Sequence, residues 1–158
     1  MPALKIKIAW IGKTKEPAIQ SLTDEYLKRI SRYAQVEGLA LRDEIALLEM
    51  CGRIAPSKSG RATSNAKSTL ALMDSRGKQF SSEEFARFLS DYQDRNPLPL
   101  IFAIGSADGF SEIARSAAQQ AISLGKITLA HELARVVLLE QVYRAFTILK
   151  GHPYHSGH

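Results

Sequence analysis

LPLIFAIG, residues 98–105, is the stretch of sequence that decides the fold. It is a nearly continuous apolar run of strand length, without the alternation of polar and apolar residues that marks a half-buried strand. Such a run is typical of a parallel strand that is covered on both faces. We therefore expect a central parallel strand here, with helices packed on either side of its sheet.

Upstream of this run, the sequence predicts a strand followed by a helix. STLALMD, residues 68–74, has the length and composition of a short strand. Ser81 and Glu84 have the spacing of a capping box, and Phe80 and Phe85 can pack together across it. A helix is therefore expected to begin at this box.

Downstream, the chain turns through GSADGFS into a second predicted helix that begins near Ser111. Its inner side is expected to carry three apolar residues, namely Ile113, Ala117 and Ala121. LGKITLA, residues 124–130, is then predicted to be another short strand.

The last predicted helix, residues 131–150, carries more apolar side chains than one face can hold. They form one stripe and a set that widens it: Leu138, Val142, Ala145 and Leu149, and then Leu139, Tyr143 and Phe146. Something must cover the excess, and in so small a protein a second copy of the chain is an economical cover. A homodimer is therefore our hypothesis.

The N-terminal part repeats the same pattern. Apolar residues alternate with lysines over residues 4–11, which predicts a strand, and apolar spacings of three and four from Pro17 to Tyr33 predict a helix. A weaker strand is expected over 36–41, and PSKSGRATSNAKS, residues 56–68, is interpreted as a mobile loop. Strands that alternate with helices predict one α/β domain over residues 1–158, with a mostly parallel sheet flanked by helices.

Composition narrows the class of protein. The chain has 158 residues, 45% of them hydrophobic, which is enough for one hydrophobic core. Its net charge of +5 is only weak support for a polyanionic partner, because a solvated basic surface is the alternative. Cys51 is the single cysteine, so we expect a core residue in a reducing compartment. Because no signal peptide or membrane span is recognisable, the protein is expected to be cytoplasmic.

The turn IGSADG places Gly105 and Gly109 at the carboxyl end of the most buried strand, where open α/β sheets bind their ligands. Glycines there let backbone amides approach a ligand closely. The spacing matches neither a GxGxxG fingerprint nor a phosphate loop, which argues against a Rossmann dinucleotide site and an NTPase. A plain tight turn is the alternative.

The segment HPYHSGH, residues 152–158, spaces three histidines at intervals of three. It has no acidic or cysteine partner nearby and follows a helix, so we expect no metal there. His152, Tyr154 and His155 instead suit stacking on a base and hydrogen bonding to its edge, as in recognition of single-stranded RNA.

Two arginines of the last predicted helix are candidates for contact with RNA. Arg135 and Arg144 lie nine positions apart and therefore point to nearly opposite sides of a regular helix. Across a dimer, one arginine from each subunit could face the same track of phosphates. Structural pairing of Arg144 with Glu140, four positions earlier, is the alternative.

The segment LARVVLLEQVYRAFTILKGHPYH, residues 133–155, resembles the bacterial large-subunit ribosomal RNA pseudouridine N3-methyltransferases of the SPOUT superfamily. The resemblance continues through IGSADGFS, LGKITLAHEL, MDSRGK and SSEEFA, and through IAWIGKTKE and EYLKRISRY near the N-terminus. It covers nearly the whole chain and is poor only across residues 42–67.

This resemblance implies a SPOUT-type α/β fold that binds S-adenosylmethionine in a C-terminal trefoil knot, roughly residues 98–155. The family's cofactor contacts, which are largely made by the backbone, map onto Met73, Gly105, Leu124, Gly125, Lys126, Ile127, Thr128 and Leu129. Ser106 stands where the family often has a second glycine, and Met73 where leucine is usual.

For the reaction, the resemblance implies methylation of N3 of a pseudouridine in helix 69 of 23S rRNA, the position 1915 type, within the ribosome. It also implies a homodimer in which the knot of one subunit meets the tail of the other. His155 and Tyr154 are the catalytic candidates, with His155 as a base or orienting group. Arg135, Arg144 and His152 are the candidate RNA contacts.

Two other functions fit the same sequence. One is a non-catalytic RNA-binding or ribosome-assembly module that keeps the fold without binding S-adenosylmethionine. The other is a SPOUT methyltransferase that acts on tRNA, against which the HPYH tail argues by resemblance.

Overall fold

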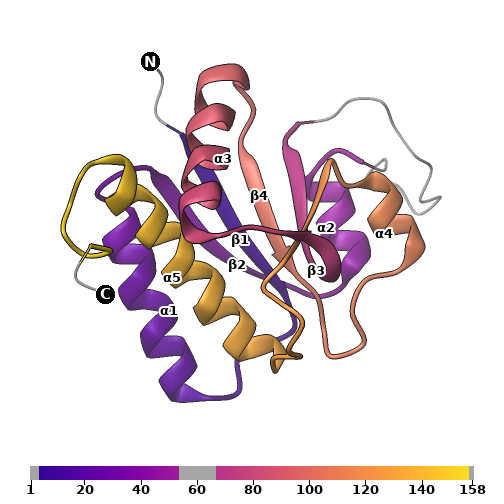
Figure 1. The fold of residues 1–158 in the computed structure, drawn as a ribbon. Helices are drawn as coiled ribbons and strands as arrows, with labels where there is room; N and C mark the ends of the chain where they lie inside the picture. Colours follow the sequence, from indigo (N-terminus) through magenta and orange to yellow (C-terminus); the bar gives the residue numbers. More distant parts are fainter. Residues whose placement is uncertain (1–3, 54–66, 157–158) are drawn as a thin grey trace.

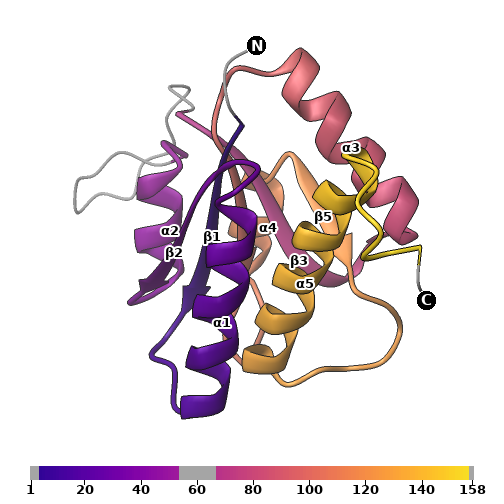
Figure 2. The same cartoon turned by 90° about the vertical axis from the view of Figure 1, so that its left-hand side faces the viewer.

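A computed structural model describes residues 4–53 and 67–156. Within them, all strand pairs are parallel and form one sheet in the order β2-β1-β4-β3-β5, which lies between two layers of helices (Figures 1 and 2). The elements in chain order are β1 (Lys5–Ile11), α1 (Pro17–Ile30), β2 (Gln35–Leu41), α2 (Glu44–Met50), β3 (Thr69–Gln79), α3 (Ser82–Arg95), β4 (Leu100–Ile104), α4 (Glu112–Ala117), β5 (Gln120–Ser123) and α5 (His131–Leu149). The predicted α/β fold with a parallel sheet is confirmed.

Strand β4 is the centre of the sheet, as the apolar run predicted. All five of its residues are buried, and it pairs with β1 on one side and β3 on the other. Leu100, Phe102 and Ile104 point into a core formed with α1, α3 and α5, whereas Ile101 and Ala103 point into a second core formed with α2 and α4. Burial on both faces explains why the strand shows no polar alternation.

Helix α3 begins as the capping-box spacing predicted. The Ser81 hydroxyl accepts the Glu84 N–H at 3.1 Å, and the Glu84 carboxylate accepts the Ser81 N–H at 2.7 Å. The rings of Phe80 and Phe85 lie 6.1 Å apart across this box. The two reciprocal bonds satisfy backbone groups that would otherwise be unpaired at the helix start.

Helix α5 lies between α1 and α3 on one face of the sheet (Figures 1 and 2). Six of the seven apolar side chains singled out from the sequence are buried within the chain, and only Leu149 stays exposed, at 38%. Leu133, in the first turn, is 50% exposed. Much of the apolar surface for which a second copy was expected is therefore covered by α1 and α3.

The segment after β4 differs from the prediction. Ser111 caps α4 as expected, but the helix is short and ends at Ala117, so Ala121 lies in β5 instead. Ile113 is 69% exposed, and Ala114 takes the buried position. The apolar spacing was therefore wrong for Ile113, whereas Ala117 packs against the core as predicted.

The strand predicted over residues 124–130 is wrong. Strand β5 ends at Ser123, and the chain then leaves the sheet as a loop. Gly125 has a φ of +127°, which no strand residue adopts, and the Ser123 hydroxyl bonds both the N–H and the carbonyl of Gly125. These local bonds replace pairing with a neighbouring strand.

The remaining elements follow the expected pattern, with one addition. The strands and helix predicted before residue 42 are confirmed, and α2 forms where the sequence indicated no clear element, with the Asp43 carboxylate accepting the Ala46 N–H at 2.9 Å. Most of the predicted loop at 56–68 lies outside the described residues.

Cys51 is a core residue, and burial raises the pKa of its thiol to about 11. No helix in the described part of the chain is long and apolar enough to cross a membrane.

Candidate functional site

The middle of β3, the loops that follow β4 and β5, and the first turn of α5 enclose a pocket of about 180 Å³, here called the first pocket. Seven of the eight residues predicted to contact a cofactor line it: Met73, Gly105, Leu124, Gly125, Ile127, Thr128 and Leu129. Lys126 is exposed and does not line the pocket. The structure thus brings three separate segments together at the sheet edge where open α/β sheets bind ligands.

Six further lining residues were missed from the sequence: Asp74, Ser75, Ile104, Ile122, His131 and Ala134. Asp74 and Ser75 directly follow the predicted contact Met73, and His131 opens α5 just after the predicted loop. Their proximity in sequence was the available signal. The sequence did not predict the path of the backbone that turns these residues toward the pocket.

A bulge in β3 places Asp74 and Ser75 at the pocket. Met73 and Lys78 both pair with Ile122 of β5, so residues 74–77 leave the regular ladder. At Gly77 an added Cβ would lie 2.5 Å from the carbonyl carbon of Ala121. Only glycine permits the backbones of β3 and β5 to approach this closely.

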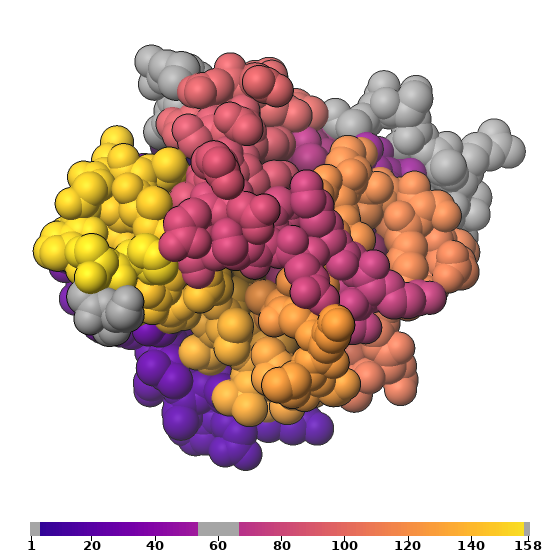
Figure 3. All heavy atoms as spheres, in the orientation of Figure 1, coloured from indigo at the N-terminus to yellow at the C-terminus, as the bar shows by residue number. Residues whose placement is uncertain are grey.

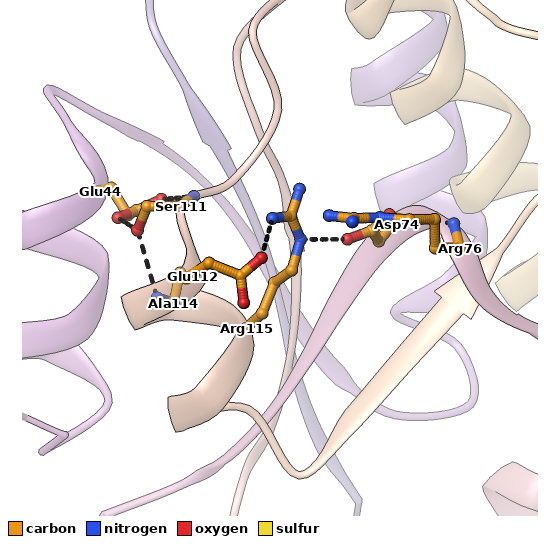
Figure 4. A network of polar contacts seen from close by, with 7 residues as sticks. All are labelled: Glu44, Asp74, Arg76, Ser111, Glu112, Ala114 and Arg115. Atoms are coloured by element: carbon orange, nitrogen blue, oxygen red, sulfur yellow. Dashed lines mark hydrogen bonds and ion pairs between the residues drawn. The ribbon is translucent and has the colours of Figure 1, made fainter.

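The Asp74 carboxylate ties the bulge to α4 (Figure 4). It accepts the backbone N–H of Arg76 at 3.0 Å and the Arg115 Nε–H at 2.8 Å, and these bonds lower the pKa of the Asp74 carboxyl despite its burial. Ser111, at the start of α4, is in turn bonded to Glu44 of α2. A charged pair therefore links one wall of the first pocket to α4.

The lining of the first pocket fits an adenosine-containing cofactor. Ile104, Ile122 and Leu129 offer apolar side chains to a flat ring, and glycines 105, 109 and 125 leave the backbone uncovered. Backbone amides at such positions can hydrogen-bond the edge of a base without a specific side chain. This explains why the pocket residues look chemically unremarkable in the sequence.

A second pocket of about 340 Å³ adjoins the first. The two share four lining residues, namely Met73, Ile122, Leu124 and Gly125. The other walls of the second pocket come from the end of β3, the start of α3 and the middle of α5. The two pockets therefore lie on either side of the chain that leaves β5.

The predicted catalytic residue Tyr154 packs on α5 of its own chain. Its hydroxyl donates to Glu140 at 2.7 Å, and its ring meets the Tyr143 ring edge-on at 4.8 Å. Burial, followed by the hydrogen bond to Glu140, raises the pKa of Tyr154 well above its ordinary value. The phenol therefore stays protonated at neutral pH and can act as a donor but not as a base.

The predicted catalytic residue His155 is held at both ring nitrogens. Arg144 lies 2.9 Å from Nδ1, and Glu83 lies 2.8 Å from Nε2. Because a guanidinium can only donate, Nδ1 is the acceptor, and Nε2–H donates to Glu83. This hydrogen bond also lowers the pKa of Glu83. The basic lone pair of the imidazole is therefore on Nδ1.

Arg144 forms the ion pair with Glu140 that was the structural alternative for it, at 2.7 Å. Burial alone would raise the pKa of Glu140, but hydrogen bonds from Arg144 and Tyr154 outweigh it and lower that pKa. The Arg144 guanidinium also lies 4.9 Å from the centre of the Tyr154 ring. Arg144, Tyr154 and His155 thus form one network on α5.

Arg135 is not placed to contact RNA. Its side chain is 1% exposed, and its guanidinium lies 3.9 Å from the centre of the Trp10 ring and donates to Thr14 at 2.9 Å. The aromatic face and the hydroxyls of Thr14 and Thr23 compensate the buried cation and fasten the loop after β1 to α5. This burial speaks against the phosphate contact predicted for Arg135.

His152 and His155 make separate contacts. His152 is exposed, and its Nδ1 accepts the Tyr154 N–H at 3.2 Å. His158 lies outside the described residues. Among residues 4–53 and 67–156, no group of three or more His, Cys, Asp or Glu side chains is placed to hold a metal ion.

Comparison with known proteins gives the family. A sequence profile described as "Predicted SPOUT methyltransferase" matches residues 4–155. "Ribosomal RNA large subunit methyltransferase H" of Koribacter versatilis (strain Ellin345) is 54% identical over 98% of this chain and 100% of its own length. The protein of the same name from Geobacter sp. (strain M21) is 43% identical over 96% and 99%. The chain belongs to the SPOUT methyltransferase family.

Solved structures agree with the fold of this SPOUT methyltransferase. "A probable methylase family protein" from Haemophilus influenzae Rd KW20 superposes with a TM-score of 0.60 at 10% identity, covering 96% of this chain and 70% of its own. The SpoU methyltransferase AviRb from Streptomyces viridochromogenes, solved with AdoMet, has a TM-score of 0.52 at 12% identity, covering 91% and 58%. These likenesses bear on the fold. Family membership makes the chain an enzyme whose methyl donor is S-adenosylmethionine.

Proposed function

We propose that this enzyme methylates ribosomal RNA, and specifically N3 of a pseudouridine in helix 69 of 23S rRNA on the assembled ribosome. The observation that carries the proposal is that segments from β3, β4 and β5 bring seven of the predicted cofactor contacts into one pocket. Near-complete coverage of relatives named "Ribosomal RNA large subunit methyltransferase H" supports the ribosomal substrate. The net charge of +5 suits a polyanionic partner.

The first pocket would hold the cofactor through Met73, Gly105 and the backbone of residues 124–129. When bound there, S-adenosylmethionine supplies an electrophilic methyl group. The contribution of the chain is to hold the acceptor nitrogen in line with that group, because positioning can account for much of the rate of a transfer between two bound partners.

The N3 proton must leave as the new N–C bond forms, and we propose that His155 accepts it at Nδ1. The bond from Nε2–H to Glu83 keeps the lone pair on Nδ1 and stabilises the imidazolium that results. Arg144 donates to Nδ1 in this structure, so it must withdraw first. A phosphate of the RNA can compete for the guanidinium, which gives Arg144 its proposed role as an RNA contact.

The remaining features of the proposal concern assembly. We propose a homodimer in which the tail of one subunit faces the knot, roughly residues 98–155, of the other. Leu133 and Leu149, exposed at the two ends of α5, are apolar surface that such a partner would cover. His152 is exposed and is proposed to touch the RNA. A ribosomal substrate would place the enzyme in the cytoplasm.

The test is transfer of tritium from labelled S-adenosylmethionine to ribosomes from a strain that lacks its own copy of the enzyme, followed by mapping of the labelled nucleoside. We expect label at N3 of one 23S rRNA pseudouridine. His155→Ala should lower the rate about 100-fold or more, because a positioned acid or base contributes about 10²–10⁴-fold. Its affinity for S-adenosylhomocysteine should stay unchanged.

Other results would redirect the assignment. Label on tRNA would favour a SPOUT enzyme with another RNA substrate. Failure to bind S-adenosylhomocysteine would favour a non-catalytic RNA-binding module. Light scattering after gel filtration tests the dimer, and a monomer at micromolar concentration would contradict a shared active site.

A further inference from the structure

The second pocket adjoins the proposed cofactor pocket, and a methyl acceptor needs such a position. Reacting atoms have to approach to about 3–3.5 Å before transfer, so the acceptor must occupy space that is continuous with the cofactor pocket. The second pocket shares Met73, Ile122, Leu124 and Gly125 with the first, and its volume of about 340 Å³ is enough for a nucleobase. Position and size therefore both suit the acceptor base.

The walls of the second pocket combine apolar surface with side-chain amides. Phe80, Phe85 and Val137 supply the apolar part, and Gln79 and Gln141 face the same space from β3 and α5. Pockets that bind a flat polar ring use this combination, with apolar contact to its faces and a few hydrogen bonds to its edge.

The Gln141 amide is oriented before any ligand binds. The Ser82 hydroxyl donates to its Oε1 at 2.7 Å, and its Nε2 donates to Glu140 at 2.9 Å. An amide has two N–H donors and an oxygen with two lone pairs. Among the described residues, these are the bonds that Gln141 makes, so one N–H and one lone pair remain for a ligand.

We propose that the second pocket binds the target base, a pyrimidine flipped out of the RNA, and that Gln141 hydrogen-bonds one of the carbonyls that flank its N3. This rests on the proposed function. As N3 gives up its proton, negative charge develops on those carbonyl oxygens. The charge is neutralised when N3 bonds to the methyl carbon and the methyl–sulfur bond breaks, which leaves S-adenosylhomocysteine. A fixed N–H donor to one of them stabilises that charge, and Ser82 is the residue that positions the donor.

The same hydrogen-bonded chain leads from the second pocket to the tail. Gln141 bonds Glu140, which in turn bonds both Arg144 and Tyr154, and Arg144 bonds His155. His155 returns to α3 at Glu83, the neighbour of Ser82. Figure 3 looks onto this face, where the C-terminal segment in yellow lies against α3 in pink. Within one subunit, the second pocket and the tail are therefore joined by one network of hydrogen bonds.

The experiment compares Gln141→Leu with the unchanged enzyme in two measurements. Because Gln141 does not line the first pocket, calorimetric affinity for S-adenosylhomocysteine should stay within about twofold. The kcat/KM for methyl transfer to ribosomes should fall about 10- to 100-fold, as when one preorganised donor is removed. Co-sedimentation with ribosomes in the presence of S-adenosylhomocysteine should weaken as well.

Two further variants make the result specific. Ser82→Ala keeps the Gln141 amide but removes its orienting bond, so we expect a smaller loss of about 3- to 10-fold in kcat/KM. Gln93→Leu makes the same chemical change near the other end of α3, about 16 Å along the helix from Ser82, and should change neither measurement.

The possible outcomes separate the pocket from the proposed function. Unchanged methyl transfer by Gln141→Leu would overturn the base pocket. A loss of S-adenosylhomocysteine affinity as large as the loss of kcat/KM would overturn it too, because Gln141 would then act through the cofactor pocket or the fold. If the unchanged enzyme methylates a different RNA, the proposed function fails. The variants are then measured on that RNA, where a selective loss with Gln141→Leu still supports the base pocket.

Discussion

The first pocket is the richer in glycine, whereas the second pocket beside it is the richer in glutamine and phenylalanine. Three glycines and the loop after β5 line the first, while two glutamines, serines and phenylalanines line the second. The first should therefore respond to changes in backbone path and tolerate changes of side chain. The second should respond to the removal of single polar groups. Substitutions of a glycine and of its neighbours can test this difference.

The largest effect is expected from Gly77→Ala, which should damage both pockets at once. Its Cβ would lie 2.5 Å from the Ala121 carbonyl carbon, so β3 and β5 would have to separate. We expect a loss of about 3 kcal/mol in unfolding free energy, at the upper end of ordinary overpacking because the clash is with backbone. Urea denaturation measures it, and Ser75→Ala in the same bulge is the control. A Gly77→Ala protein of normal stability would disprove the close approach.

A smaller effect, on affinity for S-adenosylhomocysteine, should distinguish the role of the backbone from that of the side chains in the loop after β5. Gly125→Ala forces alanine to a φ of +127°, at a cost of about 1–3 kcal/mol, so affinity for S-adenosylhomocysteine should fall about tenfold. Lys126→Ala, one residue later, removes an exposed side chain and should change that affinity less than about twofold. Calorimetry measures both. A larger effect of Lys126→Ala would mean that side chains, too, hold the cofactor.

The smallest effect is expected from the charged pair of Asp74 and Arg115, which links one wall of the first pocket to α4. Asp74→Asn should cost about 1 kcal/mol of unfolding free energy at pH 7, because the partner Arg115 is partly exposed. The pKa of Asp74 is lowered in the folded state, so this contribution is present above the unfolded pKa near 3.9 and is lost as pH falls through the folded value. Urea titrations at pH 7 and near pH 3 should show the difference shrinking. A constant difference would assign the effect to packing.

The sequence predicted those elements whose signals are local. The apolar run of β4, the alternation in β1 and the capping box of α3 each depend on residues within one turn or one strand, and all three are confirmed. The strand predicted over 124–130 was wrong because its apolar alternation is not used for pairing. Gly125 and the hydroxyl of Ser123 turn the chain out of the sheet instead.

The sequence predicted part of the candidate site and missed residues whose place depends on tertiary contacts. The resemblance to SPOUT methyltransferases pointed to seven residues that the structure brings to one pocket, although they come from three distant segments. It did not reveal Asp74 or Gln141, whose roles depend on contacts with α4 and α3. Arg135 was misjudged because its position on a helix does not show that Trp10, Thr14 and Thr23 surround it.

By itself, the sequence determined the class of fold, the family and the segments that line the first pocket, because periodicity, capping and family motifs depend on neighbouring residues. Only the tertiary structure decided that β3 bulges against β5 at Gly77, that Arg135 is buried, and that Gln141 faces a second pocket. Each of these depends on how closely two distant backbones approach. That distance is set by packing of the whole core, to which residues from all along the chain contribute.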